Sequence, residues 1–116
     1  MDRRKELKLQ YKQMKPEMGV IIIRSELDNK CYLEGTQNIK GTINSAKFKL
    51  EAGIHPNREL QRAWKEQGEK NFLIQVLENL EYEEDESKTD YSEELALLEM
   101  VWTEKLAKNN MEFYQK

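Results

Sequence analysis

The run MGVIIIR, residues 18–24, constrains the fold of this chain more than any other segment. Its β-branched apolar residues favour a buried extended strand over a helix. The turn-forming segment DNK, residues 28–30, follows, and the apolar segment CYL, residues 31–33, then resumes the extended pattern. The sequence therefore predicts a β-hairpin near its beginning, and the remaining elements have to pack against it.

Two helices are expected after the hairpin. Apolar residues recur at helical spacing from Ile39 to Leu50 and stop at Gly53, which can adopt the left-handed conformation of a helix C-cap. Asn57 is a typical N-cap residue, and it predicts a second helix that ends at Gly68. The expected buried face of this second helix consists of Leu60, Ala63, Trp64 and Gln67.

Further along, the segment FLIQVL, residues 72–77, predicts a third strand, and Asp90 or Ser92 is expected to open a last helix. Good helix formers over residues 2–14 predict a leading helix that stops before Pro16. We therefore expect an α+β fold, with a small three-stranded antiparallel sheet flanked by helices over residues 17–116. Residues 1–16 would form an N-terminal helical extension.

Charge is distributed unevenly along the 116 residues, although the net charge is only −3. Residues 1–15 carry six Lys or Arg and two acids, whereas residues 81–99 carry nine acids and a single lysine. A basic end favours a phosphate-rich partner. The acidic run is either a solvated loop, a guard against misplaced nucleic acid or a docking surface for a protein.

The apolar segments and the cysteine content bear on the cellular compartment. The longest apolar run, residues 20–23, is far too short to cross a bilayer, and residues 1–8 contain no apolar stretch typical of a secretion signal. The single cysteine, Cys31, has no partner for an internal disulfide. We expect a cytoplasmic protein in which Cys31 packs in or beside a strand, without contact to a membrane.

Several short segments carry a family resemblance. The first strand begins Gly19-Val20-Ile21 where many small bacterial GIY-YIG nucleases have Gly-Ile-Tyr. The second strand has YLEGT, residues 32–36, where they have Tyr-Ile-Gly before Ser-Thr. The segments HPNRELQRAW, residues 55–64, GEKNF, residues 68–72, and VLE, residues 76–78, are also similar. From about residue 19 to about residue 106, the chain resembles the GIY-YIG nuclease family.

The resemblance implies a phosphodiester-cleaving site. In the family, one tyrosine from each motif activates a water, an arginine neutralises the phosphate, and a glutamate holds one divalent metal. Carried over position by position, the catalytic residues that remain are Tyr32, His55 and Glu99, of which Glu99 would hold Mg²⁺ or Mn²⁺. The departures are Ile21 for the first tyrosine, Glu34 for the motif glycine, Thr42 for the arginine and Ala46 for a histidine.

These departures weigh against cleavage by the family mechanism. Loss of a general base costs roughly a hundredfold to ten-thousandfold in rate, and loss of a charge stabiliser about a hundredfold to a thousandfold. We therefore interpret Tyr32, His55 and Glu99 as remnants of a site, and we expect the small residues Thr42 and Ala46 to close the cleft. For Glu99 two alternatives remain: an ion pair with a basic residue such as Arg24, or a metal site.

Three functions are consistent with this sequence. In the first, a catalytically degenerate domain binds nucleic acid or another partner without cleavage, and no cofactor is needed. Its nucleic-acid-binding residues would be Lys40, Lys47, Lys49, Arg58, Arg62 and Lys65. In the second, the chain is a metal-dependent DNA endonuclease with a rebuilt site that uses Glu34 and Glu99 as ligands. In the third, it is a protein-interaction or regulatory module that docks through the leading helix or the acidic loop, residues 81–90.

Overall fold

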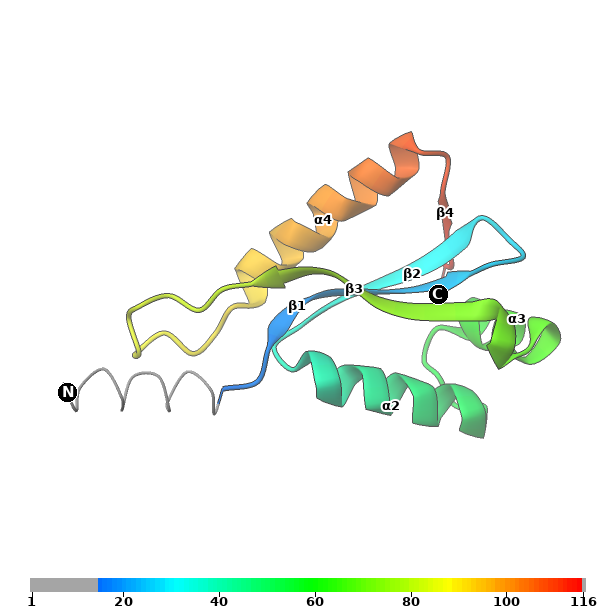
Figure 1. Ribbon diagram of the computed structural model, residues 1–116, viewed down its shortest axis with the longest axis horizontal. Helices are drawn as coiled ribbons and strands as arrows, with labels where there is room; N and C mark the ends of the chain where they lie inside the picture. Colours follow the sequence, from blue (N-terminus) through cyan, green and yellow to red (C-terminus); the bar gives the residue numbers. More distant parts are fainter. Residues whose placement is uncertain (1–14, 116) are drawn as a thin grey trace.

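The computed structural model describes residues 15–115, so the leading helix expected over residues 2–14 lies outside the described residues. Figure 1 shows the chain order of the elements. They are β1 (Met18–Ser25), β2 (Lys30–Thr36), α2 (Ile39–Ala52), α3 (Arg58–Gln67), the short 3-10 helix η1 (Glu69–Asn71), β3 (Phe72–Leu80), α4 (Ser92–Lys108) and β4 (Glu112–Phe113). Within residues 15–115, no helix has both the length and the apolar character needed to cross a membrane.

The sheet has four strands in the order β3-β1-β2-β4, and it is mixed. β1 pairs antiparallel with β2 and with β3, whereas β4 runs parallel to β2. The expected α+β class is correct, but the expectation of three antiparallel strands is wrong. Asn110, with a φ of 65°, turns the chain after α4 and brings the two residues of β4 to the free edge of β2.

The helix boundaries follow the cap residues. Gly53 takes a left-handed φ of 78° and donates its N–H to carbonyls of the last turn of α2. The Asn57 side chain accepts a hydrogen bond from the N–H of Leu60 at 3.0 Å and starts α3. At the start of α4, Asp90 accepts a hydrogen bond from the N–H of Ser92 at 3.0 Å. The predictions for Gly53 and Asn57 are confirmed. α4 begins at Ser92, but its N-cap is Tyr91, which makes no side-chain cap hydrogen bond.

β3 is longer than its apolar segment. The strand continues through the polar residues Glu78 and Asn79 to Leu80, because it pairs along the whole of β1, with a register shift between Val20 and Ile21. Gly19 permits this pairing, since a Cβ at this position would collide with the backbone carbonyl of Glu78. The predicted end of the strand, at residue 77, was too early because pairing with β1 holds a segment whose own pattern is polar.

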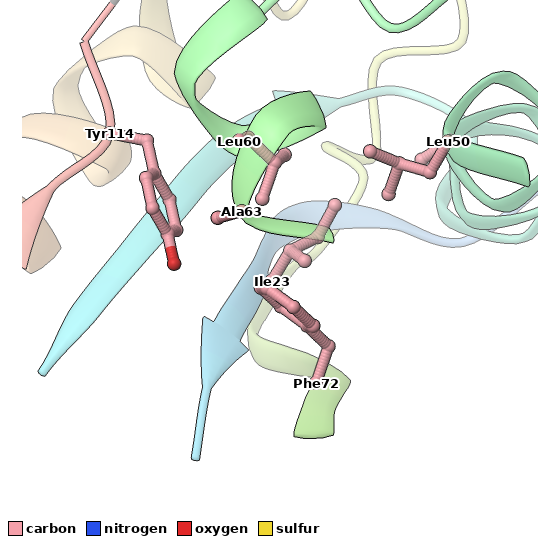
Figure 2. Close-up of a cluster of buried hydrophobic side chains, with 7 residues drawn as sticks. Ile23, Leu50, Leu60, Ala63, Phe72 and Tyr114 are labelled. Atoms are coloured by element: carbon pink, nitrogen blue, oxygen red, sulfur yellow. The ribbon is translucent and has the colours of Figure 1, made fainter. Parts of the chain in front are cut away.

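Each face of the sheet carries its own core. Figure 1 shows α4 on one side of the strands and α2 with α3 on the other. Alternation along β1 directs Val20 and Ile22 to α4, where they pack with Cys31 and Leu33. Ile23 faces the opposite side, where Figure 2 shows it among side chains from α2, α3, β3 and the C-terminal segment. Those side chains are Ala46, Leu50, Leu60, Ala63, Phe72 and Tyr114.

Cys31 is fully buried and makes no disulfide, as expected for a thiol packed in a strand. Burial raises its pKa to about 11, and the charge of Arg24 offsets this only partly. The thiol is therefore protonated at neutral pH and serves as a small apolar side chain.

Candidate functional site

A cavity of about 630 Å³ opens between β2, α2 and the loop that joins α2 to α3. Alternation along β2 places Tyr32 and Glu34 on its sheet side, because residues two apart share a face. Helical spacing places Thr42, Ala46 and Lys49 on its helix side. The remaining lining residues are Asn38, Gly41, Ser45, His55, Pro56 and Asn57.

Thr42 and Ala46 do not close this cleft, contrary to the expectation from their size. Both line the cavity, together with Tyr32 from the facing strand. The space persists because a threonine and an alanine leave room between α2 and β2 that the longer side chains of Tyr32 and Glu34 do not fill. The position thus remains accessible to a ligand.

The phenol of Tyr32 is engaged within the cavity. Its hydroxyl donates a hydrogen bond to a carboxylate oxygen of Glu34 at 2.8 Å. Burial, this hydrogen bond and the negative charges of Glu34 and Glu99 raise the pKa of Tyr32 well above its ordinary value. A phenol held protonated in this way is a poor acceptor for the proton of an attacking water.

Two of the four positions that depart from the family pattern, Ile21 and Thr42, take the place of its first tyrosine and its arginine, and neither carries a charge. Ile21, opposite Glu34 in the strand pair, is fully buried. The hydroxyl of Thr42 shares a hydrogen bond of 2.6 Å with the hydroxyl of Thr36. Neither side chain can take up a proton at neutral pH or neutralise a phosphate, so these two positions supply neither the base nor the cation that the resemblance implies for them.

His55 is held in one orientation at the edge of the cavity. Its ring lies edge-on to Tyr32, with the two ring centroids 5.3 Å apart. Its Nδ1 accepts a hydrogen bond from the backbone N–H of Asn57 at 3.0 Å, so the neutral ring carries its proton on Nε2. Burial lowers the pKa of His55 below its ordinary value. A neutral imidazole with one donor thus borders the cavity.

Glu99 does not pair with Arg24. Its carboxylate accepts a hydrogen bond from the backbone N–H of Gly35 at 3.3 Å. Arg24 lies opposite Cys31 in the strand pair, four residues along β2 from Gly35, or about 13 Å at the rise of a β-strand. The ion-pair alternative with Arg24 is therefore wrong. The Nε of Arg24 is buried and has no hydrogen-bond partner among the described residues, 15–115.

Metal binding would depend on Glu99 and not on a preformed cluster. Among residues 15–115, no three His, Cys, Asp or Glu side chains gather where they could hold a metal ion. Mg²⁺ is commonly held by one or two carboxylates, with substrate phosphates and water completing its coordination. Glu99 borders a small cavity of about 230 Å³ together with Tyr32, which fits such a single-carboxylate site.

The structure brings three of the six candidate basic residues together. Arg58, Arg62 and Lys65 line a second cavity of about 650 Å³ on α3. Lys49 lines the first cavity, and His55 and Pro56 border both. The other two are separate: Lys47 lines a different cavity near Glu51, and Lys40 is exposed on α2.

The acidic segment is organised around one cation. Lys88 forms ion pairs with Glu83 at 3.4 Å and with Glu94 at 3.1 Å, and its ammonium lies 5.2 Å from the centroid of the Tyr91 ring. The side chain of Gln37 bridges to this segment, since it donates to the carbonyl of Thr89 and accepts from the N–H of Tyr91. Residues 88–91 are thus tied to the loop that precedes α2.

Two asparagines that border the cavity have roles that the sequence predicts only in part or not at all. Asn57, predicted as an N-cap, also donates from its side chain to the carbonyl of Tyr114 at 3.1 Å and is almost fully buried. Asn38 was not predicted to have a role, yet it caps α2 by accepting from the N–H of Gly41. The signal for Asn38 was present, because an Asn just before a helical pattern is a typical cap.

Comparison with known proteins identifies the fold. No family model and no curated protein matches this chain. A solved structure of the catalytic domain of the homing endonuclease I-TevI is similar over 85% of this chain and 99% of its own length, with 25% identity and a TM-score of 0.65. A mutant of the same catalytic domain is similar over 85% of this chain and 92% of its own length, with 22% identity and a TM-score of 0.66. The chain therefore has a GIY-YIG-like nuclease fold.

Proposed function

We propose that this chain is a nuclease-fold domain that binds nucleic acid without cleaving it. The observation that carries the proposal is the hydrogen bond that the Tyr32 hydroxyl donates to a carboxylate oxygen of Glu34 at 2.8 Å. A water attacking a phosphate needs a group that accepts its proton, and Tyr32 is held protonated by burial and by its carboxylate partner. The neighbouring positions, Ile21 and Thr42, supply neither a base nor a cation.

Binding is supported by the cations beside the cavity. Arg58, Arg62 and Lys65 lie on one side of α3 and line its cavity together. None of the three forms an ion pair within residues 15–115. Free cations next to an open cavity are what a phosphate backbone requires, because neutralising phosphates releases counterions. The similarity to the catalytic domain of a homing endonuclease makes DNA the first partner to test.

The proposal is tested by titrating labelled DNA with the full chain at low salt, using single-stranded, duplex and branched substrates. Arg58→Ala with Arg62→Ala should weaken binding at least tenfold and lower the salt slope by about one for each phosphate that is no longer neutralised. The matched control is Lys70→Ala with Lys108→Ala, which also removes two positive charges but from exposed positions outside this cavity, and it should change binding little. Absence of binding to every substrate would refute the proposal, as would cleavage in Mg²⁺ or Mn²⁺.

A metal-dependent endonuclease is the second candidate. It is favoured by the position of the Glu99 carboxylate, which borders a cavity together with Tyr32. Incubation with supercoiled DNA and Mn²⁺ would then give nicks in the unaltered protein but not in Glu99→Gln. Equal background in both proteins would remove this candidate, and Glu104→Gln, on the exposed side of α4, is the matched control.

A further inference from the structure

We infer that the 630 Å³ cavity takes one unpaired nucleobase that carries an amino group, with Glu34 as the acceptor of that group. The phosphates next to this base would lie on the basic residues of α3. The inference rests on the proposed function and names the part of the nucleic acid that the site recognises.

Glu34 is the residue that sets the chemistry of the cavity. It is half-buried, and its hydrogen-bond partner is the neutral hydroxyl of Tyr32. Within residues 15–115 no Lys, Arg or His forms an ion pair with it. A carboxylate offers about four acceptor positions, of which Tyr32 occupies one. Glu34 would repel a phosphate and attract an N–H donor, so the ligand must present a donor here.

The rest of the lining suits a flat polar ring. The volume of the cavity lies within the range of about 300–1,000 Å³ that is usual for small-molecule sites. The aromatic ring of Tyr32 forms part of the wall, and Ser45 and Asn38 add a hydroxyl and an amide. His55 adds an imidazole whose proton is on Nε2. These groups can donate to and accept from the edge of a base, and the amino group of cytosine is a regular partner of glutamate.

The cations lie on the helix side of the cavity or next to it, away from Glu34 on the sheet side. Lys49 is at the helix side of the first cavity, and Arg58 and Arg62 line the second, which shares His55 and Pro56 with the first. A nucleotide has the same arrangement of charge, since its phosphate is anionic and its base offers neutral N–H donors. A lysine- or arginine-rich peptide would satisfy Glu34 but would be repelled by these cations.

An unpaired base is required because the cavity has to enclose the base itself. In a duplex one N–H of the amino group still faces the major groove, but a paired base would have to leave the stack before its ring could enter the cavity. Single-stranded or branched nucleic acid offers the group at no such cost. The cavity therefore predicts a preference for single-stranded over fully paired substrates.

The test compares two single-stranded 12-mers, oligo-dC and oligo-dT, by fluorescence anisotropy with the full chain at low salt. The two pyrimidines differ in the group at C4, where cytosine has an amino donor and thymine a keto acceptor. We expect oligo-dC to bind about tenfold more tightly, the size of one hydrogen bond to a charged group. A 12-mer of abasic sites measures the contribution of the backbone alone and should bind no better than oligo-dT.

Glu34→Gln provides the matched variant. Glutamine has the same shape and can still accept from Tyr32, but it replaces the other carboxylate oxygen by an amide donor. We expect this variant to lose the tenfold preference for oligo-dC, whereas Glu104→Gln should keep it. The comparison of dC with dT on the unaltered protein needs no variant, so it decides the question even if Glu34→Gln does not fold.

The outcomes separate the inference from the proposed function. If no oligonucleotide binds, the proposed function fails and the inference fails with it. Equal binding of dC, dT and the abasic strand would overturn the inference and leave nucleic-acid binding intact. The same result would follow if Glu34→Gln strengthened binding of all three equally, because Glu34 would then act only by repelling phosphate.

Discussion

The two faces of the sheet share their strands but differ in what the strands present. Toward α4, β1 and β2 present Val20, Ile22, Cys31 and Leu33, which are all buried and apolar. Toward α2 and α3, the same strands present Ile23 to an apolar cluster and Tyr32 and Glu34 to an open cavity. Apart from Arg24, which lies opposite Cys31, β1 and β2 thus present only a core to α4, whereas their other face combines a core at one end with a polar site at the other.

The two faces of the sheet should therefore differ in which amino-acid substitutions they tolerate. Replacement of a residue on the α4 face has to preserve volume, because dense packing transmits any change to its neighbours. On the cavity side, charge and hydrogen-bonding groups can change without loss of the fold, since the side chains there border open space. Glu34, Thr42 and Ala46, three of the four departures that the resemblance indicates, all line the cavity.

The largest effect is expected on the α4 face. Ile22→Ala should lower the free energy of unfolding by about 2–5 kcal/mol, because it removes buried methyl groups and leaves a cavity. Chemical denaturation measures this change, and Leu97→Ala on the exposed side of α4 should cost far less. The separation of the two faces would break down if the folded variant lost nucleic-acid affinity in proportion to its stability.

The next effect concerns Asn57, which connects the core with the cavity on the α2 and α3 face. Asn57→Ala should cost about 1–2 kcal/mol or more, because it removes the N-cap of α3 and the buried bond to the carbonyl of Tyr114. Asn38→Ala is the matched control, since Asn38 caps α2 from an exposed position. Equal losses of unfolding free energy in the two variants would contradict a special role for the buried cap.

Thr42→Val should have a smaller effect. The change keeps the shape of the side chain and removes the hydroxyl that shares a 2.6 Å hydrogen bond with Thr36. The free energy of unfolding should fall by about 0.5–1.5 kcal/mol. Thermal and chemical denaturation measure the change, and a loss as large as that of Ile22→Ala would show that this wall of the cavity is part of the core.

The smallest effect is the dependence of stability on pH. Because the pKa of His55 is lowered in the folded state, the unfolded chain binds a proton more readily. The contribution of His55 to stability is therefore present above the unfolded pKa of about 6.5 and is lost as pH falls through the folded value. Urea denaturation at pH 7.5, 6.0 and 5.0 should show that the free energy of unfolding depends less on pH in His55→Gln than in the unaltered chain. The same pH dependence in both proteins would contradict a contribution from His55.

Much of the fold could be predicted from local chemistry. The hairpin, the end of α2 at Gly53 and the start of α3 after Asn57 all follow from turn and cap residues. Such residues act within a few positions of themselves, so a single sequence displays them. β4 could not be predicted in this way, because two residues pair with β2 only after α4 has returned the chain to it.

For the candidate site, the sequence named residues but did not predict their geometry. The family resemblance placed Tyr32, His55 and Glu99 at catalytic positions, and the structure brings Tyr32 to both of the others. It did not predict that Tyr32 donates to Glu34 or that Glu99 accepts from Gly35. Alternation along β2 places Tyr32 and Glu34 on one face, but the bond between them depends on rotamers that neighbouring residues select.

The sequence by itself determined the order of the strands and helices from β1 to α4 and the caps at Gly53 and Asn57, because these depend on side-chain identity and short spacing. Only the tertiary structure decided that the cleft beside Thr42 and Ala46 stays open and that Arg58, Arg62 and Lys65 border an adjoining cavity. It also decided that Glu99 lies beside Gly35 and away from Arg24. These features arise where α2, α3 and α4 pack against the sheet, and the packing of separate elements sets distances that no local pattern contains.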